Sequence, residues 1–181
     1  MVYLFMADGT EELESVAPLD VLRRGGVEII TVGVTGKTVK LSHGLLVNCD
    51  KTLEELDADA VPEAVILPGG MPGTINLENA ARVHHWIDLA NQNHKLLCAI
   101  CAAPSILGHK HILEGKRAIS FPGFEKDLYG ALVCKDQGVV RDDNIITARG
   151  AGVALPFALE ILAALTSKEK AAEVAGAMQC Q

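Results

Sequence analysis

A single cysteine stands where a short apolar run gives way to a helical pattern, and a sulfur in such a place could act as a nucleophile. The apolar run at residues 95–100 has the length of a buried strand, and the small residues Ala102 and Ala103 follow Cys101. A strand that turns into a helix through one residue forces that residue into strained dihedrals, as at the G-x-S-x-G nucleophile elbow. The dipole of the following helix favours a thiolate at Cys101. The alternative is a buried structural cysteine, because free cysteine is among the most buried residue types.

Two other predicted strands end in groups that could serve the same sulfur. Residues 2–7 lead into an acidic helix start that contains Glu14, and residues 63–67 lead into Gly69 and Gly70. Glycine lets a backbone N–H approach a ligand closely. Sites in open α/β sheets form at the carboxyl ends of the strands. If these strands are neighbours, an acid, a backbone donor and a thiol converge on one pocket.

The alternation of short strands and helices predicts an α/β fold with a mostly parallel sheet and helices on both faces. The spacing of Asp8 and Glu11 is that of a capping box at the start of the first helix. We expect residues 1–181 to form a single domain. The further predicted elements are a helix at 11–24, a strand at 27–34, a hairpin at 38–41 and 45–48, a helix at 79–93, strands at 115–120, 139–141 and 144–148, and helices at 153–165 and from 167 onward.

The composition and charge of the chain exclude several classes of protein and of binding partner. Hydrophobic residues make up 49% of the chain and the mean hydropathy is +0.25, which argues against a disordered chain. The net charge of −7 argues against nucleic acid or an anionic membrane as a partner. No apolar run approaches the roughly 20 residues of a membrane-spanning helix, and residues 2–7 are too short for a signal peptide. Five cysteines without framework spacing favour the reducing cytoplasm.

Four segments together resemble the ThiJ/PfpI family, in the branch of the Parkinson-disease-associated protein deglycase and its bacterial relatives. The resemblance covers residues 2 to about 175 and implies a flavodoxin-like α/β/α sandwich with a nucleophile elbow, and usually a homodimer. The segments that carry it are GTEELE at 9–14, VILPGG at 65–70, AICAAP at 99–104 and TARGAG at 147–152.

The resemblance also implies roles for individual residues. Cys101 matches the reactive cysteine of the elbow, and Glu14 matches the glutamate whose carboxyl hydrogen-bonds to it. Gly70 and Ala102 match the backbone amides that face the reacting oxygen. A neutral, desolvated Glu14 can donate to a thiolate, whereas an ionised one would repel it. The alternative for Glu14 is a solvated acid in the first turn of a helix.

Two positions near the expected pocket or dimer interface depart from the pattern of some members. Phe121, followed by Pro122, stands where some members carry a histidine, so a Cys–His dyad and a protease are not supported. His43 stands where some relatives place an arginine that reaches across the dimer, and Arg24 matches a second arginine near the interface. Otherwise His43 is a turn histidine and Arg24 a cation at a helix C-terminus.

The main functional hypothesis is a cofactor-free, cysteine-dependent enzyme for reactive carbonyls in carbonyl and oxidative stress. Its partner is a small carbonyl such as methylglyoxal, or a glycated protein or nucleotide, as for a glutathione-independent glyoxalase or a deglycase. The alternative from another class is a redox-responsive chaperone or cysteine-sulfinate sensor without turnover. Nothing in the residues indicates the thiazole or phosphate substrate of a thiamine-precursor role.

Two further kinds of site are considered and disfavoured. Cys98 and Cys101 have thioredoxin spacing, but Cys98 is expected inside a strand, buried and unable to attack. No metal site is expected, because His84 and His85 point to different helix faces and His109-x-His111 lacks a third ligand.

Overall fold

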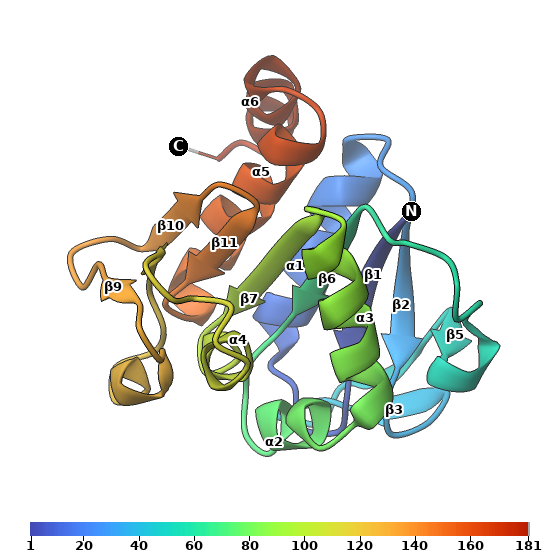
Figure 1. Cartoon of the computed structure of the whole chain (residues 1–181). Helices are drawn as coiled ribbons and strands as arrows, with labels where there is room; N and C mark the ends of the chain where they lie inside the picture. The colour runs from blue at the N-terminus through green and yellow to red at the C-terminus, as the bar shows by residue number, and fades with distance from the viewer. Residues whose placement is uncertain (181) are drawn as a thin grey trace.

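A seven-stranded sheet forms the centre of the structure (Figure 1). The structure is a computed structural model that describes residues 1–180, so Gln181, the last residue of the expected domain, lies outside it. The strand order is β10-β11-β7-β6-β1-β2-β5, and all neighbours pair in parallel except β10, which is antiparallel to β11. The strands of this sheet are β1 Val2–Met6, β2 Ile29–Gly33, β5 Lys51–Thr52, β6 Ala64–Leu67, β7 Leu96–Ile100, β10 Val139–Asp142 and β11 Ile145–Ala148.

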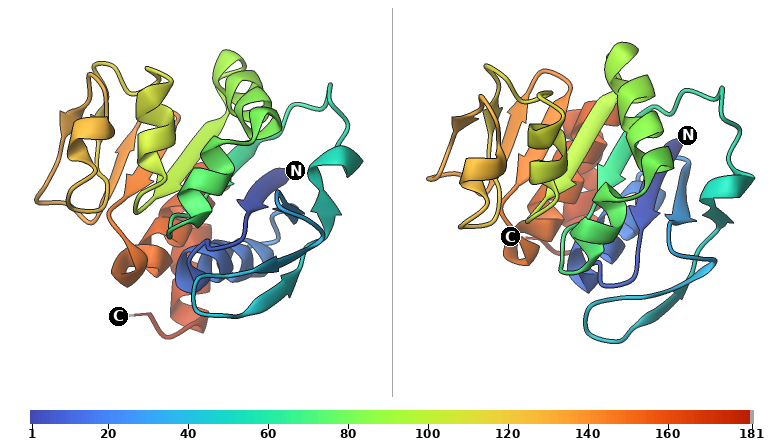
Figure 2. Two further views of the ribbon diagram at one scale, coloured as in Figure 1. Left: turned by 90° about the horizontal axis from the view of Figure 1, so that it is seen from below. Right: turned by 60° about the horizontal axis from the view of Figure 1, so that its bottom comes forward.

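Helices cover both faces of this sheet, which confirms the predicted α/β architecture (Figure 2). One face is covered by α1 Glu12–Arg24, α5 Ala154–Leu165 and α6 Lys168–Ala177, and the other by α2 Gly73–Glu78, α3 Ala81–Gln92 and α4 Pro104–His109. The expected hairpin forms as β3 Thr38–Lys40 and β4 Leu46–Asn48. None of the helices within residues 1–180 combines the length and the apolarity needed to span a bilayer.

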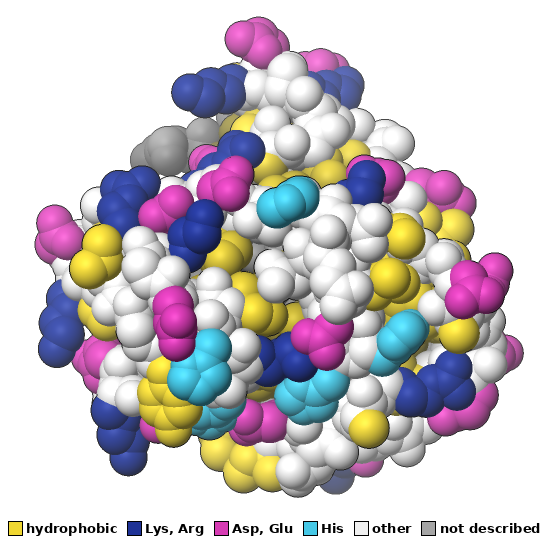
Figure 3. Space-filling view, in the orientation of Figure 1, with side chains coloured by type: hydrophobic (Ala, Val, Ile, Leu, Met, Phe, Trp, Pro, Cys, Tyr) yellow, Lys and Arg dark blue, Asp and Glu magenta, His cyan; other side chains and the backbone are white. Residues whose placement is uncertain are grey.

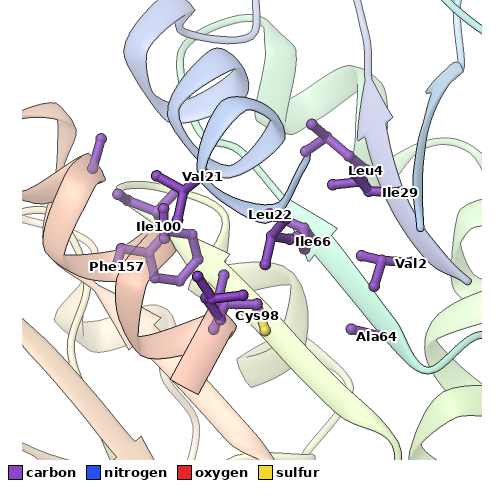
Figure 4. Packing of buried hydrophobic residues seen from close by; sticks show 14 of the residues in the cluster. Val2, Leu4, Val21, Leu22, Ile29, Ala64, Ile66, Cys98, Ile100 and Phe157 are labelled. Carbon is purple, nitrogen blue, oxygen red and sulfur yellow. The ribbon is translucent and has the colours of Figure 1, made fainter. Parts of the chain in front are cut away.

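The core on the α1 and α5 face is built from aliphatic side chains (Figure 4). Because strand side chains alternate between faces, Leu4, Ile66 and Cys98 point to this side of the sheet. Leu22 from α1 and Phe157 from α5 close over them. Strands of this kind, buried on both faces, are what a nearly continuous apolar run predicts.

The start of α1 differs from the predicted capping box. Glu11 itself is the N-cap, and its Oε2 accepts a hydrogen bond from the Glu14 N–H at 2.9 Å. Asp8 lies outside the helix and accepts from the Lys40 N–H at 2.8 Å, which ties it to the hairpin. The segment that leads into α1 is therefore hydrogen-bonded both to the first turn of the helix and to the β3–β4 hairpin.

Two predicted elements are shorter than expected. The helix predicted at 79–93 is α3, and a separate short helix, α2, precedes it. The strand predicted at 115–120 is reduced to β8 Arg117–Ala118, which pairs in parallel with β9 Leu132–Val133 outside the main sheet. The strand stops because the next donors go elsewhere: Ile119 N–H donates to Thr147 Oγ1 and Phe121 N–H to the Cys101 carbonyl. The remaining elements are 3-10 turns: η1 Leu53–Glu55, η2 Glu125–Asp127 and η3 Ala151–Val153.

Candidate active site

Cys101 is the turn residue between β7 and the helical turn that leads into α4, as the elbow prediction requires. Its φ of +65° is a left-handed conformation, which is uncommon for a residue with a side chain. Two backbone hydrogen bonds hold it there: Cys101 N–H donates to the Ala148 carbonyl at 2.9 Å, and the Cys101 carbonyl accepts from Phe121 N–H at 2.7 Å. Backbone strain of this kind persists only where the surroundings enforce it, and it is concentrated at functional sites.

The three strands that lead into the candidate residues are neighbours in the sheet. β6 lies between β1 and β7 and is parallel to both, so their carboxyl ends meet at one edge. Glu14 is only 1% exposed there, and its Oε2 accepts a hydrogen bond from Gly69 N–H at 2.8 Å. Within residues 1–180, Glu14 Oε1 is buried without a hydrogen-bond partner. The structure therefore brings together Glu14, Gly69, Gly70, Cys101 and Ala102, as predicted.

Gly69 and Gly70, the two glycines that follow β6, are required by close packing. A Cβ on Gly69 would lie 2.6 Å from Cys101 Cβ and 2.9 Å from Glu14 Oε2. Gly70 has a φ of +87°, and a Cβ there would lie 2.6 Å from the Gly9 carbonyl oxygen. Only residues without a side chain let this backbone lie against the sulfur and the carboxyl.

The surroundings move the pKa values of both titratable groups upward. Burial raises the pKa of Glu14 to about 7, although hydrogen bonds from Gly69 and Cys101 oppose the shift. Burial and the charge of Glu14 raise the pKa of the Cys101 thiol to about 12, against hydrogen bonds from the N–H groups of Gly70 and Ala102. Both influences act against the resting thiolate that the sequence predicts. The helix-dipole argument left out the burial of the sulfur beside a carboxyl, which opposes its ionisation.

His43 lies beside the site, whereas Arg24 does not. The Glu12 carboxylate accepts from His43 N–H at 2.6 Å, contacts His43 Nδ1 at 2.9 Å, and accepts from Ser42 at 2.8 Å. These contacts lower the pKa of Glu12 to about 2 and raise that of His43. Arg24 pairs with Asp20 at 2.9 Å near the other end of α1, about 15 Å along the helix from Glu14. Within this chain, Arg24 therefore takes no part in the pocket.

A cavity of about 430 Å³ lies next to Phe121, whose N–H donates to the Cys101 carbonyl, although Cys101 and Glu14 do not themselves line it. Phe121 and Pro122 line it, as predicted, and no imidazole stands in their segment. Our sequence reasoning missed the opposite wall, which consists of Arg149, Gly150, Ala151, Gly152 and Val153. A signal was available, because these residues follow β11, whose carboxyl end lies at the same edge of the sheet as that of β7.

Two further features of the structure concern the cysteine inside β7 and possible metal ligands. Cys98 lies inside β7 at 1% exposure, as expected, and burial raises the pKa of its thiol strongly. Within residues 1–180, one group of three possible ligands has its atoms within 4.8 Å of one another, namely Glu11, Glu12 and His43. All three members are already engaged, since Glu11 caps α1 and His43 pairs with Glu12.

Comparison with known proteins places this geometry in a known group. A model described as the DJ-1/PfpI family matches residues 1–164. Protein dj-1beta of Drosophila melanogaster is 35% identical over 174 residues, which are 95% of this chain and 92% of that protein. The glutathione-independent glyoxalase DJR-1.2 of Caenorhabditis elegans is 29% identical over 167 residues, which are 92% of this chain and 89% of that protein.

The solved structures agree with the sequence comparison. The structure of oxidized DJ-1 from Toxoplasma gondii matches with a TM-score of 0.93 at 29% identity, over 98% of this chain and 97% of that one. Some relatives are longer: this chain is 34% identical to DJ-1 homolog B of Arabidopsis thaliana over 97% of its own length but spans 40% of that protein.

Proposed function

Because the chain belongs to the DJ-1/PfpI family, we propose that it is a cofactor-free, cysteine-dependent enzyme that acts on reactive carbonyls. The observation that carries this proposal is the buried Glu14 carboxyl, with its pKa of about 7, beside the sulfur of a strained elbow. A carboxyl with a pKa near neutrality can take and return a proton within one turnover. The name of the worm relative, a glutathione-independent glyoxalase, supports methylglyoxal as the test substrate.

In the first step, the Cys101 sulfur bonds to the aldehyde carbon of methylglyoxal. The thiol proton passes to the Glu14 carboxylate, and the π electrons of the carbonyl move onto its oxygen. The N–H groups of Gly70 and Ala102, which are hydrogen-bonded to the sulfur before the reaction, then hydrogen-bond to the oxyanion. Return of the proton from Glu14 gives a neutral hemithioacetal and restores the carboxylate.

In the second step, Glu14 moves a proton between adjacent carbons. Its carboxylate removes the proton from the sulfur-bound carbon, the electrons pass toward the neighbouring carbonyl, and Glu14 delivers the proton to that second carbon. The hydroxyl proton of the hemithioacetal moves to the oxygen of the second carbon, so that the first carbon becomes a carbonyl and the second carries a hydroxyl. The product is a thioester of lactate, which water hydrolyses to lactate and the free thiol. The first carbon is oxidised as the second is reduced, so no external oxidant is consumed. A protein deglycase would form the same carbon–sulfur bond at a hemiaminal carbon; the carbon–nitrogen bond breaks, and the amine leaves with the proton held by Glu14.

The proposal is tested by lactate formation from methylglyoxal in the absence of glutathione. We expect turnover by the natural chain, none by Cys101→Ser and a severe loss in Glu14→Gln. Cys134→Ser is the matched control, because Cys134 is also partly exposed but follows β9, outside the main sheet. Unchanged turnover in either of the first two variants would refute the scheme.

A second candidate function is a redox sensor or chaperone that uses the same sulfur. The observation in its favour is that Cys101 is partly exposed and accepts hydrogen bonds from backbone N–H groups. The same N–H groups could donate to the oxygens of a sulfinate. Two molecules of peroxide would convert the thiol to the sulfinic acid and yield two molecules of water. Intact-mass measurement after mild peroxide treatment tests this function. The absence of a two-oxygen adduct on Cys101 would count against it.

The setting that we propose for this chemistry is the cytoplasm. All five cysteines are free in the structure, which fits a reducing compartment. We also propose that the chain forms a homodimer.

A further inference from the structure

His109, the last residue of α4, joins three segments that are far apart in the sequence. Its Nδ1 is hydrogen-bonded to Glu78 Oε1 at the end of α2, and its Nε2 lies 3.9 Å from Asp127 Oδ1 at the end of η2. The side chains of His109, Glu78 and Asp127 are only 34%, 30% and 25% exposed. Figure 3, in the orientation of Figure 1, shows histidine and acidic side chains next to one another in the lower half of the molecule. A hydrogen bond to a carboxylate that is partly withdrawn from water is stronger than a fully exposed one.

Each of the three segments begins at the candidate active site. α2 comes directly after the loop that carries Gly70, and α4 comes directly after Cys101 and Ala102. η2 follows Phe121 and Pro122, which line the cavity. In Figure 1, α2 lies at the lower edge of the molecule and α4 lies above and to the left of it. A contact among the far ends of these short segments can therefore fix their near ends, where the reaction takes place.

Close packing around His109 makes such a contact effective. A Cβ on the preceding residue, Gly108, would lie 2.0 Å from the Asp127 carbonyl oxygen, so the backbone of α4 touches that of η2. The ring of Tyr129 lies 5.2 Å from the His109 ring, centroid to centroid, and covers it from one side. Since densely packed backbone transmits displacement, a shift of η2 would also move α4.

We propose that His109 is a positioning residue that clamps α2, α4 and η2 together and thereby holds the N–H groups of Gly70 and Ala102 in place. Its effect on turnover rests on the proposed function, whereas its effect on the three segments does not. Misplacement of catalytic groups by about 1 Å can cost up to about 100-fold in rate. For His109→Ala we expect kcat to fall about tenfold with KM unchanged, because the two donors act in the transition state.

Hydrogen exchange measured by mass spectrometry, without substrate, tests the clamp itself. In His109→Ala we expect the amides of residues 70–78 and 121–127 to exchange about fivefold faster. The matched control is His111→Asn. His111 also contacts Tyr129, but its Nδ1 pairs at 2.6 Å with Glu114, only three residues along the chain. Asparagine tolerates the φ of +58° at this position, so the control should exchange like the natural chain.

Two more variants separate a positioning role from general destabilisation. Glu78→Gln keeps the shape of its side chain but removes the charge, and should raise exchange and lower kcat in the same direction as His109→Ala. His109→Asn keeps a donor near the place of Nδ1 and should restore most of kcat. Natural exchange rates in both His109→Ala and Glu78→Gln would overturn the clamp. If the natural chain forms no lactate, the proposed function fails, while the exchange rates still decide the clamp.

Discussion

Glu14 and Cys101 are best treated as a pair that shares protons. The carboxyl titrates near neutrality and the thiol far above it, because both are buried and Glu14 also disfavours the ionisation of Cys101. When the pair holds one proton, the directions of the two pKa shifts favour a thiol beside a carboxylate over a thiolate beside a neutral acid. This state is suited to react, since the sulfur can attack while the carboxylate takes its proton.

The pH dependence of kcat/KM follows from this pair. Below pH 7 both groups are protonated and no base is available, so kcat/KM should rise with pH and pass its midpoint at about 7. The fall at high pH should lie beyond the usual range of assays, since the pKa of the thiol is about 12. Steady-state kinetics with methylglyoxal across this range provide the measurement. A flat profile, or one that falls through neutrality, would contradict the assignment of Glu14 as the base.

Stability should depend on pH through the same carboxyl. The pKa of Glu14 is raised from 4.5 unfolded to about 7 folded, so its contribution is fully present below about pH 4.5 and is lost as pH rises through 7. The loss amounts to about 3 kcal/mol in the free energy of unfolding. Glu14→Gln removes this term, and its amide oxygen can still accept from Gly69. Urea denaturation at about pH 5 and at about pH 8 should show that the free energy of unfolding falls less with rising pH in Glu14→Gln than in the natural chain. Equal losses in both chains would argue against a raised pKa.

At the scale of elements, the site depends on how closely the loop after β6 lies against the elbow. Gly69 is the point of contact, since it has no side chain between the sulfur and the carboxyl. Its N–H also supplies the hydrogen bond that orients Glu14. The loop therefore fixes the acid as well as the backbone donor of Gly70.

Gly69→Ala should consequently disrupt the site. The new Cβ would lie within 3 Å of Cys101 Cβ, the Ile100 carbonyl oxygen and Glu14 Oε2, so the loop must move and lactate formation should fall at least about 100-fold. Gly176→Ala is the matched control, because a Cβ there meets nothing within 4 Å and alanine favours the helix α6. The control should keep full activity and unfold at a slightly higher temperature. Comparable activities in the two variants would show that contact at Gly69 is unimportant.

The parts of the fold that follow from periodicity could be predicted from the sequence. The buried strands, the helices α1, α3 and α5 and the convergence of three strand ends are fixed by apolar runs and glycine-rich turns. The short strand β8 could not be read in this way, because hydrogen bonds to Thr147 and Cys101 interrupt it from elsewhere in the fold. For the same reason the upward shift in the pKa of the Cys101 thiol could not be predicted, since burial is a property of the assembled site. The contacts of His109 likewise depend on tertiary packing.

At the scale of the whole molecule, an apolar surface lies next to the site. Leu13 and Val16 are exposed on one face of α1, and Leu45 and Leu46 are exposed on the β3–β4 hairpin. The turn of this hairpin is tied to the start of α1, since Ser42 N–H donates to the Thr10 carbonyl at 2.9 Å (Figure 2). We propose that a second copy of the chain covers this surface, as the family resemblance implies.

Sedimentation velocity should therefore show a dimer of the natural chain. Leu46→Glu should shift it to the monomer, because a charge would be buried in the interface. Leu132→Glu is the matched control: Leu46 and Leu132 are similarly exposed, at 64% and 60%, but Leu132 lies on β9, outside this surface. A monomeric natural chain, or a dimer that Leu46→Glu leaves intact, would refute the proposed interface.

The central claim is that one sulfur binds the carbonyl and one carboxyl moves its proton. Carbon NMR of Glu14→Gln mixed with methylglyoxal labelled at the aldehyde carbon tests both roles at once. The account predicts a bound hemithioacetal signal that persists without lactate and disappears when Cys101 is also replaced by serine. Lactate formed at the natural rate, or a bound signal that survives the loss of Cys101, would contradict it.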